Sequence, residues 1–460
     1  MRYLAAIFFA ALASLSFEPY GIWPLALIGL AGWFTLLTQN RLKYRIFLSY
    51  LFGACLLLLN QHWTGVYVGN LPWLILSLSQ AVIFIMPAFF VRKGAKYNQY
   101  LFALSYVLTE LLLRTVPFTG FGWTRLSFTQ VDSPLAVIYP IGGVALVALV
   151  LALVSSARKF RSLVIAALIP AVCWFIPANV QNEESISIAL VQGGVVNLGL
   201  DFNSKPQEVF KRHLDQSISS IKPNEVDLII WPENAVDVDV NTNPQVNDSI
   251  KNLSTMLNTP ILIGAVTKSI DGPKNQSILY NSAKGQIYTK RYLTPFGEYL
   301  PLRSVAEKVS KYSSQITDFK AGEQNTVFDV NGNRFNTLIC YELINDIFVA
   351  EARNNFLVIQ TNNATFGDTS QLDQQLNIAR VRALESAREI AYVSTTGTTS
   401  FISPQGKILS SLDKFKPATL KSQLNATQGL TYRQSFGHLV EPLAMIVLLG
   451  LLLLRVRRGS

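Results

Sequence analysis

The sequence is short of charged residues, of cysteine and of histidine. Only 15% of its 460 residues are charged, against about a quarter in an ordinary soluble protein, and 50% are hydrophobic. The deficit is concentrated in the first 180 residues and the last 25 or so, whereas the middle has an ordinary composition. This distribution excludes a wholly soluble protein and predicts an integral membrane protein with one large soluble domain.

Cysteine occurs three times, and Cys340 is the only one between residues 180 and 435. A disulfide bond within that region is therefore excluded. Cys340 ends a short apolar run, Thr337 to Ile339, that we predict to be a buried strand. Side chains at strand ends in α/β sheets are well placed for chemistry, so Cys340 is a candidate nucleophile. The alternative is a buried structural thiol.

Histidine also occurs three times, and none of the three is a convincing partner for Cys340. His62 lies in a predicted external loop, and His438 begins the last apolar run. His213 lies in a polar stretch of an amphipathic helix, where we expect a solvated surface residue. A Cys–His dyad is therefore disfavoured, and carboxylates and lysines remain as activating groups.

Long apolar runs account for the membrane prediction, because a spanning helix needs about 20 residues. We predict a transmembrane helical bundle of seven spans over 1–180, a soluble domain over 181–435, and a C-terminal transmembrane helix with a basic tail over 436–460. The runs cover residues 3–17, 23–40, 46–60, 72–91, 99–114, 134–156, 162–178 and 438–454. The first run could instead be a cleaved signal peptide, but the next run follows almost at once, which favours a retained span.

The net charge of +10 has a membrane explanation, because much of the excess lies beside these runs and no basic patch with interleaved aromatics points to nucleic acid. The alternate loops 17–22 and 61–71 carry no Lys or Arg. Cytoplasmic loops are enriched in both, so we predict cytoplasmic termini, eight spans and an external soluble domain. The basic clusters are Arg41, Lys43 and Arg45; Arg92, Lys93 and Lys96; Arg158, Lys159 and Arg161; Arg455, Arg457 and Arg458.

The soluble domain alternates between predicted strands and helices, which is typical of an α/β fold with a mixed sheet. A hairpin is expected across 281–293, turning at Lys284-Gly285. The predicted strands are 185–192, 226–231, 260–266, 337–339, 356–361, 390–400 and 401–410, and the predicted helices are 208–221, 249–257 and 371–388.

Two further residues have the character that a cysteine nucleophile requires. Glu233 directly follows an apolar strand and Trp231-Pro232, so partial desolvation would raise its pKa toward that of a working general base. The alternative is an acidic residue at a helix N-terminus. Lys290 precedes a Pro-Phe-Gly-Glu turn, which suggests a fixed loop rather than a free surface. A cation near Cys340 would favour the thiolate and stabilise an oxyanion.

The motifs around these three residues resemble a known family. Trp231-Pro-Glu233, Lys290 with Pro295-Phe-Gly-Glu298, and Ile339-Cys-Tyr-Glu342 are similar to the Glu-Lys-Cys triad of the nitrilase (carbon–nitrogen hydrolase) superfamily. With the flanking spans, nearly the whole chain resembles the apolipoprotein N-acyltransferases of Gram-negative bacteria. The resemblance includes the Gly-Phe-Gly-Trp loop and Ala379-Arg-Val-Arg-Ala-Leu-Glu385.

The resemblance implies a nitrilase-like αββα sandwich on a bundle of about eight spans, in the Gram-negative inner membrane with the catalytic domain in the periplasm. It implies that Cys340 takes an acyl chain from a phospholipid, most simply phosphatidylethanolamine, as a thioester. Glu233 would be the general base and Lys290 the oxyanion stabiliser, with Glu298, Tyr341 and Glu342 in support. The acceptor would be the α-amine of the S-diacylglyceryl cysteine of an apolipoprotein. We expect no metal, cofactor or nucleic acid to be bound. We expect the protein to be a monomer.

The sequence departs from the family pattern at three positions, which concern lipid and acceptor gating more than the triad. Phe202 lies near a usual Trp, Thr365 replaces a typical Trp, and Gln375 stands where a His is common. Two other functions remain open. A membrane-tethered amidase would pass its acyl group to water, and a non-catalytic sensor or transporter would have only Glu110 as an intramembrane ionisable residue of note.

Overall fold

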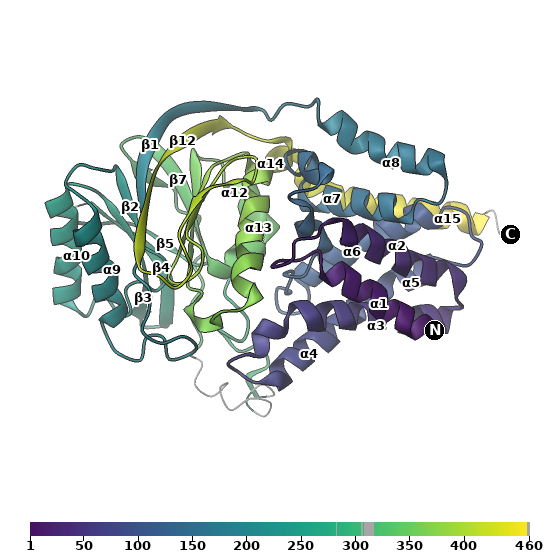
Figure 1. Ribbon diagram of the computed structural model, residues 1–460, viewed down its shortest axis with the longest axis horizontal. Helices are drawn as coiled ribbons and strands as arrows, with labels where there is room; N and C mark the ends of the chain where they lie inside the picture. The colour runs from purple at the N-terminus through teal and green to yellow at the C-terminus, as the bar shows by residue number, and fades with distance from the viewer. Residues whose placement is uncertain (282, 305–306, 308–316, 458–460) are drawn as a thin grey trace. The chain divides into compact units, whose positions relative to one another are not determined.

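The computed structural model describes the chain except residues 282, 305–306, 308–316 and 458–460, and for 283, 284, 456 and 457 only the backbone. Arg458 of the last basic cluster therefore lies outside the described residues. The chain divides into two compact units (Figure 1). Unit 1 comprises Met1–Asn179 with Leu430–Ser460, and unit 2 comprises Val180–Gly429.

Unit 1 is helical, and each of the eight predicted apolar runs falls on helix. Among the described residues, four helical stretches are long and apolar enough to cross a membrane: Leu42–Asn60, Asn70–Phe90, Pro134–Ser156 and Tyr432–Arg455. The main helices are α1 (Arg2–Ser14), α2 (Pro24–Gln39), α3 (Leu42–Asn60), α4 (Asn70–Gln80), α5 (Met86–Phe90), α6 (Asn98–Thr115), α7 (Tyr139–Ser156), α8 (Phe160–Cys173), α14 (Tyr432–Phe436) and α15 (Val440–Arg457).

Unit 2 contains two six-stranded sheets, with strand orders β12-β1-β2-β3-β4-β5 and β11-β10-β9-β8-β7-β6. The first sheet is formed by β1 (Val180–Gln192), β2 (Leu228–Ile230), β3 (Ile261–Ser269), β4 (Gly272–Asn281), β5 (Ala283–Thr289) and β12 (Ala418–Gly429). The second is formed by β6 (Phe328–Val330), β7 (Asn333–Ile339), β8 (Phe356–Thr361), β9 (Ile390–Ser394), β10 (Ser400–Ile402) and β11 (Ile408–Ser411).

The two faces of the first sheet bury different partners, because successive side chains of a strand point to opposite sides. In β1, Ile188 and Leu190 belong to the core that also holds Phe335 and Val358 of the second sheet. Ala189 and Val191 face the other core, which contains residues of α9 (Glu208–Ser220) and α10 (Pro244–Leu257). Helix α13 (Ser370–Ser386) packs against β9 of the second sheet. The layering confirms the predicted α/β sandwich.

The predicted hairpin turn was misplaced. The structure pairs Asn281 with Ala283 across β4 and β5, so Lys284 and Gly285 lie within β5 rather than at the turn. The reason is that β4 begins with a polar stretch, Gly272–Ser277, which lacks the apolar alternation of a recognisable strand. β6 and β12 were not predicted either, and α10 begins at Pro244 rather than at residue 249.

The prediction of a solvated His213 is wrong. Its side chain is fully buried, its Nδ1 lies 2.8 Å from the Val209 carbonyl oxygen, and its ring lies against Trp231. Val209, His213 and Ser217 are spaced four residues apart and share the buried face of α9. Burial lowers the pKa of His213 to about 4, so the imidazole is neutral at physiological pH.

Candidate active site

Glu233 lies just beyond the end of β2, where a loop crosses closely over β3. It is 5% exposed. Gly264 of β3 makes this approach possible, because a Cβ there would lie 2.6 Å from the Glu233 Cα. The Glu233 carboxylate accepts hydrogen bonds from Asn275 Nδ2 at 2.7 Å and from the Asn362 backbone N–H at 2.9 Å. The carboxylate is therefore held by groups within β4 and directly after β8.

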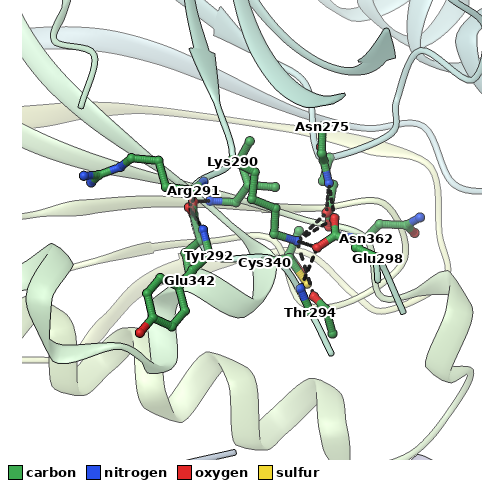
Figure 2. A network of polar contacts seen from close by, with 12 residues as sticks. Asn275, Lys290, Arg291, Tyr292, Thr294, Glu298, Cys340, Glu342 and Asn362 are labelled. Carbon is green, nitrogen blue, oxygen red and sulfur yellow. Dashed lines mark hydrogen bonds and ion pairs between the residues drawn. The ribbon is translucent and has the colours of Figure 1, made fainter. Parts of the chain in front are cut away.

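Lys290 follows β5 directly, and its side chain is 1% exposed. Its Nζ lies 2.9 Å from Glu298 Oε2 (Figure 2). The same nitrogen lies 3.5 Å from Glu233 Oε1. Its backbone is fixed as well, because Lys290 N–H donates to the Asn275 carbonyl at 2.9 Å. The ammonium is thus buried between two carboxylates, in an immobilised loop.

Asn275, in β4, is a member of the site that sequence analysis missed. Its Nδ2 donates to Glu298 Oε1 at 2.9 Å (Figure 2). It also donates to Glu233 Oε1 at 2.7 Å, so one amide joins both carboxylates. The side chain is 2% exposed. No local signal distinguished it, because an asparagine in a polar stretch before a hairpin is more typical of a turn.

The two carboxylates are electrostatically different. Burial raises the pKa of Glu233, and the more distant Lys290 only partly opposes this effect. Burial would also raise the pKa of Glu298, but the close Lys290 ammonium and the Asn275 amide outweigh it and lower that pKa. Burial disfavours the ammonium of Lys290, but Glu298 and Glu233 raise its pKa well above the usual range. Glu298 therefore pairs with Lys290, and Glu233 is left with the basicity of a proton acceptor.

Cys340 begins a sharp turn at the end of β7. Its φ of 49° is in the left-handed region, which non-glycine residues rarely adopt, and a 3-10 turn over Cys340–Ile344 follows. The Cys340 side chain lies beside that of Lys290 (Figure 2). Burial and the charge of Glu233 raise the pKa of the Cys340 thiol to about 12, although Lys290 acts in the opposite direction. The resting sulfur is thus a thiol that needs a base, not a preformed thiolate.

Glu342 fixes the Cys340 turn to the loop that carries Lys290. One carboxylate oxygen accepts from the Ile339 N–H at 2.8 Å. The other accepts from the Arg291 N–H at 2.7 Å and from the Tyr292 N–H at 3.1 Å (Figure 2). It also accepts from the Tyr288 hydroxyl at 2.7 Å. The residue is fully buried. Because its two oxygens already accept from four donors, Glu342 has a positioning role. The neighbouring residue Tyr341 is also buried.

Gln375, on α13, contacts Cys340. The orientation of its side-chain amide is determined by the neighbouring polar groups. Its Oε1 accepts from the Thr361 hydroxyl at 3.0 Å and the Asn363 amide at 2.6 Å. Further donors to the same oxygen are Gln371 and Tyr392. Because Oε1 is occupied by donors, Nε2 faces Cys340 Sγ, at 3.5 Å. The amide donates to the sulfur, which favours negative charge on it.

Replacing Gln375 by leucine is expected to slow alkylation of Cys340 by iodoacetamide roughly tenfold, because a donor to the developing thiolate is lost. The measurement is the second-order rate of labelling at a fixed alkaline pH, without any lipid substrate. Asp373→Asn is the control, since Asp373 lies on the same helix and pairs with Lys414. An unchanged labelling rate in Gln375→Leu would show that the amide has no influence on the thiol.

The two other departures lie in neighbouring loops of unit 2. Phe202 and Thr365 are both half-buried. Their loops are joined by a hydrogen bond from the Gly199 N–H to the Ala364 carbonyl at 2.8 Å.

Two family models match this chain, each in a different part. Residues 9–157 match the model described as the apolipoprotein N-acyltransferase N-terminal domain, and residues 187–433 match the model described as carbon–nitrogen hydrolase. The second match covers more than half of the chain and contains Glu233, Lys290 and Cys340. The chain therefore belongs to the carbon–nitrogen hydrolase family.

Curated relatives that carry the name apolipoprotein N-acyltransferase match this chain over nearly its whole length. The protein from Vibrio vulnificus is 29% identical over 95% of this chain and 93% of its own length. The protein from Haemophilus influenzae is 28% identical over 98% of this chain and 94% of its own length. Together with the two matched regions, these relatives identify the enzyme as an acyltransferase.

Solved structures of two nitrilase-like proteins are similar to about half of this chain. A carbon–nitrogen hydrolase superfamily protein from Xanthomonas campestris is 16% identical and covers 53% of this chain and 91% of its own, with a TM-score of 0.41. A nitrilase-superfamily amidase from Nesterenkonia is 18% identical and covers 54% and 93%, with a TM-score of 0.39.

Proposed function

We propose that this enzyme transfers a fatty acyl chain from a phospholipid, through a thioester on Cys340, to the α-amine of the S-diacylglyceryl cysteine of apolipoproteins. The observation that carries the proposal is the constellation of the half-buried Cys340 with the buried Glu233 and the Glu298-paired Lys290, in a chain with a helical unit suited to a membrane. The name of the relatives, apolipoprotein N-acyltransferase, supports the transfer of an acyl chain to an amine of apolipoproteins.

The first step forms the acyl-enzyme. Glu233 takes the proton from the Cys340 thiol as Sγ attacks the ester carbonyl of the phospholipid. The Lys290 ammonium, together with a backbone N–H near Tyr341, stabilises the resulting oxyanion. The C–O bond then breaks, Glu233 returns the proton to the departing oxygen, and the lysophospholipid leaves. Phosphatidylethanolamine is the donor that we propose.

The second step reverses the direction of proton flow at sulfur. The neutral α-amine attacks the thioester carbonyl, a C–N bond forms, and Glu233 accepts the proton that the nitrogen loses. The C–S bond breaks, and the Cys340 sulfur leaves as thiolate and is protonated by Glu233. Gln375 and Lys290 both favour negative charge on this leaving sulfur. The products are an amide and the free enzyme, and neither step needs a cofactor.

The test uses purified protein, phosphatidylethanolamine with a labelled acyl chain, and a synthetic S-diacylglyceryl cysteine lipopeptide. We expect label to appear in the lipopeptide as a hydroxylamine-resistant amide. A matched lipopeptide with an acetylated α-amine should receive no label. If the label is released only as free fatty acid, with or without the lipopeptide, the tethered amidase is the correct function instead.

We also propose that the protein is monomeric and lies in the Gram-negative inner membrane with eight spans, with residues 1–180 and 436–460 forming the membrane part and residues 181–435 in the periplasm. A cysteine at Ile270, which is fully exposed between β3 and β4, should react with a membrane-impermeant maleimide added to spheroplasts. The background is a chain whose three native cysteines are serine. A cysteine at Lys159 should react only after lysis, and the opposite pattern would invert the proposed topology.

A further inference from the structure

Three arginines from distant parts of the sequence meet at one end of unit 1. Arg45 lies in the first turn of α3, Arg92 comes just after α5, and Arg455 lies near the end of α15. Arg455 Nη1 donates to the Phe90 carbonyl at 2.8 Å, which fixes the end of α15 against the end of α5. Arg45 is close enough to Arg92 and Arg455 to experience the charge of both.

Among the described residues of unit 1, no carboxylate side chain lies near this cluster. The sequence places only Glu18, Glu110, Asp132 and Glu441 in residues 1–179 and 430–460. Glu441 pairs with Arg114 and lies 14 residues before Arg455 on α15, which is about 21 Å along the helix.

The other three carboxylates belong to the end of the bundle remote from Arg45. Glu18 precedes α2, whereas Arg45 follows it, and the 16 residues of α2 extend about 24 Å. Glu110 accepts from the Tyr106 hydroxyl and the Ser127 N–H, and Asp132 lies a few residues beyond Ser127. The three positive charges therefore have no acidic side chain as counter-ion within the described part of their own unit.

Arg45 is buried, although it is charged. Its side chain is 6% exposed, and its Nε and Nη1 have no hydrogen-bond partner among the residues that the structure describes. Arg92 is exposed and Arg455 is half-buried, so the cluster opens to its surroundings. A buried cation with unmet donors is costly unless an anion joins it, and guanidinium groups are suited to phosphate oxygens.

An apolar groove on α15 ends beside the cluster. It has a volume of about 430 Å³ and is lined by Val447, Gly450, Leu451, Leu453 and Leu454. Gly450 leaves open space, because no described atom lies within 4 Å of where its Cβ would be. Arg455 directly follows the last lining residue and lies near the C-terminal end of α15. An apolar groove and a cluster of positive charges thus lie next to each other. This arrangement matches a lipid, in which an acyl chain is joined to a charged headgroup.

We propose that Arg45, Arg92 and Arg455 bind the phosphate of an anionic phospholipid whose acyl chain occupies the groove on α15. Three uncompensated cations favour a headgroup of net negative charge over a zwitterionic one. The groove distinguishes a lipid phosphate from free phosphate, which would leave the apolar surface uncovered. The site lies wholly in unit 1, and its preference for net negative charge sets the bound lipid apart from phosphatidylethanolamine, the zwitterionic donor proposed above.

The test measures lipid binding by the full chain in detergent, through native mass spectrometry and the thermal midpoint of unfolding. Phosphatidylglycerol is expected to remain bound and to raise the midpoint, whereas phosphatidylcholine and inorganic phosphate should do neither. Replacing Arg92 and Arg455 by glutamine should weaken phosphatidylglycerol binding at least tenfold. Arg161→Gln is the matched control, because it removes the same charge from an exposed position outside the cluster.

Arg45→Gln should also weaken phosphatidylglycerol binding at least tenfold. If this variant does not fold, the single variant Arg92→Gln, at an exposed position, tests the proposal instead. Equal binding of phosphatidylglycerol and phosphatidylcholine would overturn the proposal. So would equal losses in Arg161→Gln and in the cluster variants, since that would indicate a diffuse charge effect. A midpoint shift reproduced by inorganic phosphate would assign the arginines to a free anion and remove the lipid.

Discussion

Cys340→Ala is expected to abolish acyl transfer, with a loss of roughly 10⁴-fold or more in turnover, because the Cys340 sulfur carries the acyl chain in the proposed reaction. Incubation with labelled phospholipid and no acceptor should label the wild type at a bond that neutral hydroxylamine cleaves. Cys340→Ala should acquire no such label. The readout is label on denatured protein, with and without hydroxylamine.

Cys55→Ala is the matched control for this experiment, because Cys55 is a partly buried thiol of unit 1 and should leave labelling unchanged. Cys340→Ser offers a second test of the chemistry. A hydroxyl at the same position should either remain unacylated or trap the acyl chain as an oxygen ester that neutral hydroxylamine releases slowly. Thioester-type label that persists in Cys340→Ala would disprove the assignment of the nucleophile.

Glu233→Gln is expected to slow both half-reactions by about 10² to 10⁴-fold, the range that a positioned general base supplies. The thiol, whose pKa burial raises to about 12, depends on this base for its deprotonation. Acylation is measured as the rate of label uptake without acceptor, and transfer as the rate of label loss after the lipopeptide is added. Glu323→Gln, at an exposed position, is the matched control.

The pH profile provides an independent check on the same residue. Burial raises the pKa of Glu233, so wild-type activity should fall as pH decreases through a value above that of an ordinary glutamate. The proton-bound form dominates below that pKa and cannot accept the thiol proton. This acidic limb should vanish in Glu233→Gln. If the limb persists while the rate falls, a different carboxylate, of which Glu298 is the nearest candidate, would be the base.

The sequence was informative where function coincides with a strand end. Glu233 and Cys340 each follow an apolar strand, and Lys290 precedes the Pro295-Phe-Gly-Glu298 turn, so their positions could be recognised locally. The structure brings the three residues together. Asn275 and Gln375 could not be found in this way. Asn275 lies in the polar part of β4, and Gln375 lies on a helix that is buried despite many polar side chains, so neither shows a periodic pattern.

The burial of His213 could not be predicted from the sequence for a different reason. The sequence Lys211-Arg-His213 suggests a polar helix face. A helix, however, presents residues four apart to the same side, and Trp231, directly after β2, packs against His213 on that side. The sequence interpretation gave more weight to the charges of Lys211 and Arg212 than to the spacing of Val209, His213 and Ser217 along the helix. Tertiary packing, which depends on where β2 ends, decided the burial.

The clamp formed by Glu342 has a consequence for how such an enzyme can change. One carboxylate joins the turn that presents the sulfur to the segment that presents the ammonium, so neither can be moved without moving the other. The positions of the Cys340 sulfur and the Lys290 ammonium are therefore coupled. A mutation can abolish this arrangement, but it cannot shift one of the two groups independently of the other. Altered preference for a lipid or a lipoprotein must instead arise in surrounding loops that this carboxylate does not hold, and there sequences can diverge while the chemistry stays the same.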